Sequence, residues 1–136
     1  MEPDTTSPDA ESGPDSPERL SQKFQRELNA GLVGLVLLAV LEQAEEDLYG
    51  YQIAKRLQER ANGHVPVKQG ALYPVLRQLS ANGLLASRIV PSYAGPPRRY
   101  YRITEAGRAT LADWRGIWRN TRDFVDGFTE SNGAIS

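Results

Sequence analysis

The chain has 136 residues, 40% of them hydrophobic, and a formal net charge of −1. This length and composition are typical of one small globular domain with a tail. Cysteine is absent and His64 is the single histidine, which excludes disulfides, thiolate metal sites, cysteine nucleophiles and a catalytic histidine pair. Because no nucleophile–base pair, metal cluster or phosphate-binding loop is visible, we expect neither an enzyme nor a required cofactor.

The near-neutral total hides an uneven distribution of charge along the chain. Residues 1–20 carry six acids and one base, a net charge of −5. Residues 51–110 carry ten bases and two acids, a net charge of +8. A strongly basic middle favours a polyanionic partner. The alternative interpretation is a solvated basic surface that has no partner.

Both ends of the chain are expected to lie outside the folded domain. Residues 1–20 are rich in proline, serine and acidic residues, and we expect them to form a disordered tail. They lack the basic start and the apolar run of a signal peptide, so we expect a cytoplasmic protein. Residues 129–136 are expected to form a flexible C-terminus.

The first predicted helix contains an apolar stretch from Ala30 to Leu41. Twelve residues are too few to span a bilayer, so we expect no membrane segment. A helix that is apolar on all sides in a protein of this kind is buried from several directions. In so small a domain, we expect part of that burial to come from a second chain.

Two further helices are predicted in the basic middle of the chain. One runs from Tyr49 to Ala61 and ends at a helix stop, Asn62-Gly63. The next runs from Gln69 to Asn82, with apolar residues at a spacing of three or four and Gly83 as its C-terminal glycine. Pro74 argues against an uninterrupted helix there, because proline removes one backbone hydrogen bond.

A β-hairpin and one last helix complete the predicted elements. Leu84–Val90 and Arg99–Ile103 are the expected strands, and Thr104 is the expected cap of the helix, with Glu105 near its positive end. Residues that alternate at spacings of three and four follow in the helix, a seam that usually faces another helix. The seam consists of Leu111, Trp114, Trp118, Thr121, Val125 and Phe128.

The order of three helices, a hairpin and a helix is that of a winged helix-turn-helix, so the predicted fold class is mostly α with a small β-hairpin wing. We assign residues 21–103 to a winged helix-turn-helix DNA-binding domain that includes the N-terminal helix. Residues 104–128 are assigned to a C-terminal dimerisation helix. In this fold the helix Gln69–Asn82 enters the major groove, and the hairpin contacts phosphates or the minor groove.

Four motifs in the same order resemble the PadR family of bacterial transcriptional regulators. They are LYGYQI at 48–53, GALYPVLRQL at 70–79, NGLL at 82–85 and GPPRRYYRITEAGR at 95–108. The resemblance covers about residues 28–127. The short last helix resembles that of the family's compact branch, which has no separate C-terminal ligand domain. It implies a homodimeric repressor whose first and last helices build the dimer, and it places Pro74 within the recognition helix.

Two positions depart from the family's pattern. The family usually has a hydroxyl residue where Lys68 stands, and it often has threonine at Ala71. Lys68 cannot accept the hydrogen bond of a helix cap, and Ala71 removes a hydroxyl contact to phosphate. The operator sequence therefore does not follow from the resemblance.

The candidate DNA-binding residues come from the two helices of the helix-turn-helix and from the wing. Gln69 and Arg77 belong to residue types that read base edges. Arg98 and Arg99 alternate along a strand, so we expect only one of them to face DNA. Tyr51 and Tyr73 are either packing residues or contacts to DNA. The candidate set is Tyr51, Lys68, Gln69, Ala71, Tyr73, Arg77, Arg98 and Arg99.

The first and last helices supply the predicted dimer contacts, and two tryptophans carry two hypotheses. Trp114 and Trp118 either pack in the dimer or line an effector pocket. In compact relatives, aromatic residues of the last helix line a cavity at the dimer interface for flat, lipophilic molecules. The predicted dimer residues are Leu32, Leu35, Leu111, Trp114, Trp118, Val125 and Phe128.

The predicted function is therefore a homodimeric DNA-binding transcriptional regulator, a repressor of an inverted-repeat operator. Its release by a small aromatic or planar effector is a further hypothesis. Two alternatives stay open. One is a winged-helix module that binds an acidic protein, because winged helices also serve as docking modules. The other is a carrier or sensor of aromatic ligands with little role at DNA.

Overall fold

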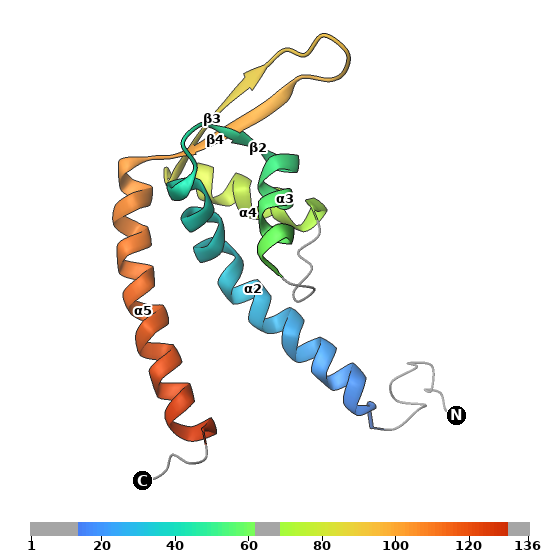
Figure 1. Cartoon of the computed structure of the whole chain (residues 1–136), viewed down its shortest axis with the longest axis vertical. Helices are drawn as coiled ribbons and strands as arrows, with labels where there is room; N and C mark the ends of the chain where they lie inside the picture. Colours follow the sequence, from blue (N-terminus) through green and yellow to red (C-terminus); the bar gives the residue numbers. More distant parts are fainter. Residues whose placement is uncertain (1–13, 62–68, 131–136) are drawn as a thin grey trace, which may run out of the picture. The chain divides into compact units, whose positions relative to one another are not determined.

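The structure is a computed structural model that describes residues 14–61 and 69–130 (Figure 1). The chain divides into two compact units, Met1–Leu32 and Val33–Ser136. The boundary between the units falls inside the segment 21–103 that we assigned to the DNA-binding domain. Lys68 and the helix stop at 62–63 lie outside the described residues, as do residues 1–13 and 131–136. The side chain of Gln69 is also outside the description, although its backbone belongs to a helix.

The first helix, α2, runs from Pro17 to Gln43 and crosses the boundary between the two units. It begins four residues inside the segment 1–20 that we expected to be disordered, which corrects that boundary. Ser16 caps the helix, because its Oγ accepts a hydrogen bond from the Arg19 backbone N–H at 3.2 Å. Pro17 then occupies the first helical position, where a missing N–H has no consequence.

The 27-residue length of α2 also corrects the argument against a membrane segment. By length and composition alone, α2 is long and apolar enough to cross a membrane. A core helix passes the same test, and the last turns of α2 bury Leu37, Leu38 and Leu41 in the second unit. The apolar stretch is thus a core element over these turns, as expected for a helix buried from several directions.

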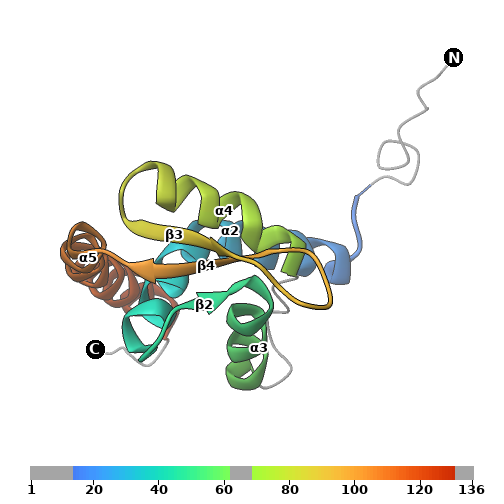
Figure 2. The same cartoon turned by 90° about the horizontal axis from the view of Figure 1, so that it is seen from above.

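The second unit is a winged helix-turn-helix, so the predicted fold class is confirmed. Helix α3 is Gly50–Ala61, helix α4 is Gln69–Ala81 and helix α5 is Glu105–Thr129. Strand β4 (Arg98–Ile103) lies between β2 (Leu48–Tyr49) and β3 (Leu85–Val90) in an antiparallel sheet (Figure 2). The sequence did not predict β2, because two residues show no strand periodicity.

One hydrophobic core joins all of these elements. Buried side chains from α2, α3, α4, the sheet and α5 pack against one another, and none of them is more than 6% exposed. Its fully buried large side chains are Leu37, Leu38, Leu48, Ile53, Leu72, Leu76 and Leu111. The apolar spacing in α4 therefore predicted the buried face of that helix correctly.

Local hydrogen bonds define where α3 begins and where α4 ends, the two helices of the helix-turn-helix. Gln52 accepts a hydrogen bond from the Tyr49 backbone N–H at 3.1 Å, which caps the start of α3. At the end of α4, Gly83 has a φ of +78° and donates to the carbonyl of Ser80, while Leu84 donates to the carbonyl of Leu79. These two bonds form a Schellman motif, as the predicted C-terminal glycine requires.

Helix α4 is continuous through Pro74, contrary to the expectation from its sequence alone. The carbonyl that lacks its helical partner belongs to Gly70, which is only the second residue of the helix. The resemblance to the PadR family predicted this placement of Pro74, and the structure confirms it.

The predicted seam along α5 is not one continuous surface. Leu111 is fully buried, and Trp114 packs against Gly34, where a Cβ would lie 3.4 Å from its ring. Val125 and Phe128 are 46% and 80% exposed. Leu111 and Trp114 therefore pack against the core of the protomer itself, whereas Val125 and Phe128 are accessible to another chain.

Candidate nucleic-acid interface

The recognition helix α4 has one buried face and one exposed face. Leu72, Leu76 and Leu79 point into the core, whereas Ala71 and Arg77 are exposed. Of the predicted DNA-binding residues in this segment, Ala71 and Arg77 are thus accessible. The major groove of B-form DNA admits an α-helix, and the exposed face of α4 is available for such a contact.

Tyr73 has a packing position between the two helices. It is half-buried, and its ring lies against Gly50, the first residue of α3. A Cβ on Gly50 would lie 2.6 Å from Tyr73 Cε1. Glycine is therefore required at position 50 if α3 and α4 are to approach in this way, a constraint that the sequence alone did not reveal.

The wing carries side chains on two faces that alternate along β4. Arg99, Tyr101 and Ile103 share one face, and Arg98, Tyr100 and Arg102 share the other. Tyr101 and Ile103 are buried, so the first face is directed toward the core. This alternation was predicted for Arg98 and Arg99, and it places their guanidinium groups on opposite sides of the sheet.

Arg99 lies on the core-facing side of the wing, and Arg77 lies on the exposed face of α4. Arg99 Nη1 donates a hydrogen bond to Ser87 Oγ at 3.1 Å. Burial raises the pKa of the Tyr101 hydroxyl, and the positive charges of Arg99 and Arg77 oppose that rise.

Arg98 belongs to an aromatic cluster on the opposite face. Its guanidinium lies 4.4 Å from the centre of the Tyr49 ring, which in turn contacts Tyr100 edge-on at 5.2 Å. The guanidinium of Arg88 lies over the second ring, 5.2 Å from the centre of Tyr100, and forms an ion pair with Asp47 at 3.0 Å. Cation–π contacts of this kind hold both guanidinium groups in place.

Tyr51 extends from this cluster into solvent. Its ring is stacked on Tyr49 at 6.4 Å and is 54% exposed. The sequence pointed to Tyr51 and Arg98 but not to the partnership of Tyr49, Tyr100, Arg88 and Asp47. The partnership depends on the pairing of Tyr49 and Arg88 with Tyr100 across the strands, and β2 left no signal in the sequence.

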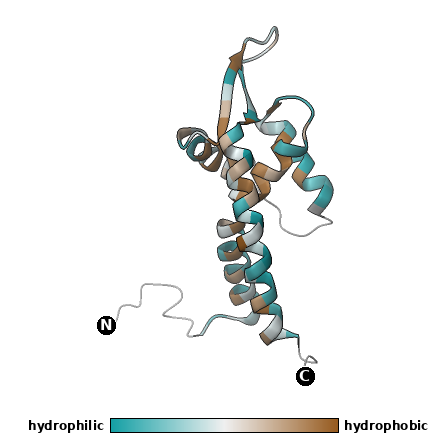
Figure 3. Cartoon of the chain, turned by 90° about the vertical axis from the view of Figure 1, so that its left-hand side faces the viewer, coloured by the Kyte–Doolittle hydropathy of each residue, from teal (hydrophilic) through white to brown (hydrophobic). Residues whose placement is uncertain are grey.

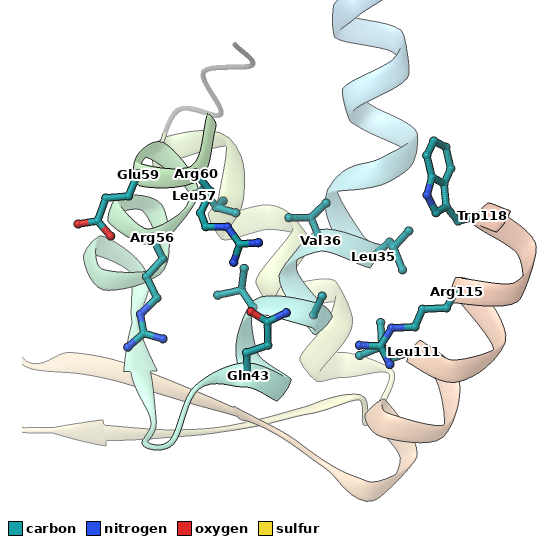
Figure 4. A pocket seen from close by; sticks show the side chains of 12 residues that line it. Leu35, Val36, Gln43, Arg56, Leu57, Glu59, Arg60, Leu111, Arg115 and Trp118 are labelled. Carbon is teal, nitrogen blue, oxygen red and sulfur yellow. The ribbon is translucent and has the colours of Figure 1, made fainter. Parts of the chain in front are cut away.

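A groove of about 660 Å³ lies between α2, α3 and α5 (Figure 4). Leu35, Val36, Leu57 and Trp118 give it apolar walls, and Arg56 and Arg60 of α3 stand on the side opposite Trp118. Trp114 is not among its lining residues. Within one protomer the groove therefore contains Trp118, whereas Trp114, one helical turn away, packs against Gly34.

The described residues contain no group of three or more histidine, cysteine, aspartate or glutamate side chains that could hold a metal ion.

Comparison with known proteins points to one family. The family described as "Transcriptional regulator PadR-like family" matches residues 37–113, which lie inside the span of the resemblance. The chain is similar to the transcriptional regulator Rv3488 of Mycobacterium tuberculosis, with 36% identity over 66% of this chain and 81% of that protein. It also matches an uncharacterized protein X of Lysinibacillus sphaericus, with 30% identity over 73% of this chain and 88% of that protein.

Solved structures agree with the sequence comparison. A PadR-family transcriptional regulator from Eggerthella lenta superimposes with a TM-score of 0.67 at 32% identity, over 84% of this chain and 96% of that chain. A transcriptional regulator from Clostridium thermocellum gives a TM-score of 0.68 at 27% identity, over 76% of this chain and 98% of that chain. The four motifs, the winged helix-turn-helix and these matches agree: the chain belongs to the PadR-like family of transcriptional regulators, which bind DNA, generally as dimers.

Proposed function

We propose that the protein is a homodimeric repressor that binds an inverted-repeat operator in the cytoplasm through α4 and the wing. The observations that support this proposal best are the exposed Arg77 on α4 and the exposed Arg99 on β4 of the adjacent wing, where its guanidinium donates a hydrogen bond to Ser87 Oγ. An arginine on a helix that fits the major groove can read a guanine edge, while an arginine on the adjacent wing can hold a phosphate. Arg98, on the other face of β4, is not expected to contact the same DNA.

The test compares three arginine variants on the DNA upstream of the protein's own gene, after a footprint has located the operator. Arg77→Ala should lower specific affinity by about 1–3 kcal/mol, with a smaller decrease on random DNA. Arg99→Ala should weaken binding to both kinds of DNA and reduce the log–log salt slope by roughly 0.9 for each phosphate that it no longer neutralises. Arg98→Ala should change both quantities less.

The matched control is Arg26→Ala, an exposed arginine in the first half of α2. If Arg77→Ala and Arg99→Ala both keep the wild-type affinity and salt slope, this face of the protein does not contact DNA. Binding of an acidic protein with no binding of operator DNA would favour the alternative, a winged-helix interaction module.

We further propose that a small planar aromatic effector binds beside Trp118 and releases the operator. Trp118 is 36% exposed at one end of the groove, which leaves its indole accessible for stacking. An effector that prefers one separation of the two recognition helices shifts the population away from the DNA-binding state. Such compounds should quench tryptophan fluorescence and lower operator affinity, and Trp118→Ala should abolish both responses while it remains a DNA-binding dimer. Dissociation of the dimer by Trp118→Ala would instead identify the indole as a packing residue.

A further inference from the structure

The inner face of the wing, which is the side of β4 that carries Tyr101 and Ile103, becomes exposed where the hairpin extends beyond the core. The two strands of the hairpin carry both hydrophilic and hydrophobic residues (Figure 3). Arg99 is paired directly with Ile89 across the strands, and Ser87 lies two residues before Ile89 on the same face. All three of these residues are exposed. The exposed part of the inner face therefore has a hydroxyl beside a cation.

Ser87 holds the guanidinium of Arg99 in place. Arg99 Nη1 donates a hydrogen bond to Ser87 Oγ at 3.1 Å. Residues in this diagonal position on two antiparallel strands are about 7–8 Å apart, so a long side chain is needed to bridge them. The bond selects one of the many rotamers that an exposed arginine otherwise samples. It uses only one N–H group of the guanidinium, and the other N–H groups remain for a phosphate.

Two other arginines of the wing are held in a different way, on the face opposite Arg99. Arg88 forms an ion pair with Asp47 at 3.0 Å, and this carboxylate neutralises its charge. The guanidinium of Arg98 lies 4.4 Å from the centre of the Tyr49 ring. Among the described residues, no carboxylate forms an ion pair with Arg99. A neutral hydroxyl thus orients the Arg99 guanidinium and leaves its full positive charge for a charge-assisted hydrogen bond to phosphate.

We propose that Ser87 is a positioning residue for DNA binding, whose hydroxyl orients the Arg99 side chain for a phosphate before DNA binds. A long side chain that becomes fixed only on binding loses its rotamer freedom at that moment, and this loss weakens the affinity. The hydrogen bond to Ser87 reduces the loss, because the guanidinium is already oriented in the free protein. The inference rests on the proposed contact of Arg99 with a phosphate and explains how the free protein prepares that contact.

The test measures the affinity of the full chain for a random DNA duplex by fluorescence anisotropy over a range of salt concentrations. Ser87→Ala should lower the affinity about 3- to 10-fold, because one long side chain in each protomer must then be ordered on binding. The log–log salt slope should stay that of the wild type, since the charge of Arg99 still neutralises a phosphate. Ser87→Thr keeps the hydroxyl on a residue that suits a strand and should retain the wild-type affinity.

A double-mutant cycle separates positioning of Arg99 from a structural role of the serine. In the Arg99→Ala background, Ser87→Ala should have no further effect on affinity, because the hydroxyl has no guanidinium left to orient. The matched control is Ser21→Ala, which removes an exposed hydroxyl from α2 and should leave both affinity and salt slope unchanged.

The result for Arg99→Ala distinguishes failure of the proposed phosphate contact from failure of this inference. If Arg99→Ala leaves affinity and salt slope unchanged, the phosphate contact of Arg99 is wrong, and positioning by Ser87 is wrong with it. If Arg99→Ala weakens binding but Ser87→Ala does not, the phosphate contact stands and positioning is wrong. An equal loss of affinity from Ser87→Ala with and without Arg99 shows that the serine acts independently, which also overturns positioning.

Discussion

At the scale of single residues, Gly50 determines how closely the two helices of the helix-turn-helix approach each other. The Tyr73 ring occupies the space that a Cβ at position 50 would need. We expect Gly50→Ala to lower the free energy of unfolding by about 1–3 kcal/mol, because a rigid aromatic ring must shift. Urea denaturation monitored by circular dichroism measures the decrease. Gly70→Ala is the control, since a Cβ there meets nothing within 4 Å. An equal effect of the two substitutions would contradict the close approach of Tyr73 to Gly50.

Ionisation of Tyr101 makes the folding stability of the protein decrease at alkaline pH. Its side chain is 3% exposed, and burial raises its pKa above the ordinary value of about 10. Since the folded-state pKa is the higher one, the unfolded chain loses this proton first as the pH rises. The contribution of Tyr101 to stability is therefore complete below pH 10 and is lost at higher pH.

The Tyr101→Phe variant should consequently lose less stability than the wild type between about pH 9 and 11. The measurement is the urea midpoint as a function of pH. Tyr93→Phe is the matched control, because Tyr93 is fully exposed and should leave the wild-type profile unchanged. Identical profiles for Tyr101→Phe and the wild type would show that ionisation of Tyr101 does not limit alkaline stability.

At the scale of elements, Thr104 joins the end of α4 to the start of α5. Its Oγ1 accepts a hydrogen bond from the Gly107 backbone N–H at 3.0 Å and donates one to the Gly83 carbonyl at 2.7 Å. The hydroxyl thus serves a helix cap and a helix end 21 residues earlier in the chain. The sequence predicted the cap at Thr104 but not the hydrogen bond to Gly83, which exists only after the hairpin has folded back.

Removal of this hydroxyl should be more harmful than the removal of an ordinary cap. We expect Thr104→Ala to lower the free energy of unfolding by about 1–2 kcal/mol, at the upper end for capping residues. Thr104→Ser keeps the hydroxyl and should remain close to the wild type. Thermal unfolding of the three proteins at equal concentration provides the comparison. If serine is as destabilising as alanine, the methyl group and not the hydroxyl carries the effect.

At the scale of the whole molecule, a symmetric dimer imposes a spacing on its operator. Two recognition helices related by a two-fold axis need half-sites about one helical turn apart, or a multiple of it. Insertion of about five base pairs between the half-sites turns them to opposite faces of the duplex. We expect the affinity to fall by roughly 100-fold or more, because only one protomer can then bind. Substitution of the central base pairs without a change of length is the control. Unchanged affinity for the lengthened operator would exclude simultaneous binding by both protomers.

The order of the helices and of the wing, the C-terminal glycine of α4 and the cap of α5 could be predicted from the sequence alone. These features depend on local rules: apolar spacing along a helix, a left-handed glycine at position 83 and a hydroxyl at position 104. It also predicted correctly that neighbouring arginines of the wing point in opposite directions, because strand alternation is local as well. The start of α2 was missed, although Ser16 and Pro17 carried a local capping signal.

The contacts between side chains of different elements could not be predicted from the sequence. The stacking of Arg98 on Tyr49, the hydrogen bond from Arg99 to Ser87 and the packing of Trp114 against Gly34 each join two different elements of the fold. The short strand β2 sets the first of these contacts, yet two residues are too few to show periodicity. Such contacts arise from packing against other elements, and no pattern within one segment encodes its neighbours.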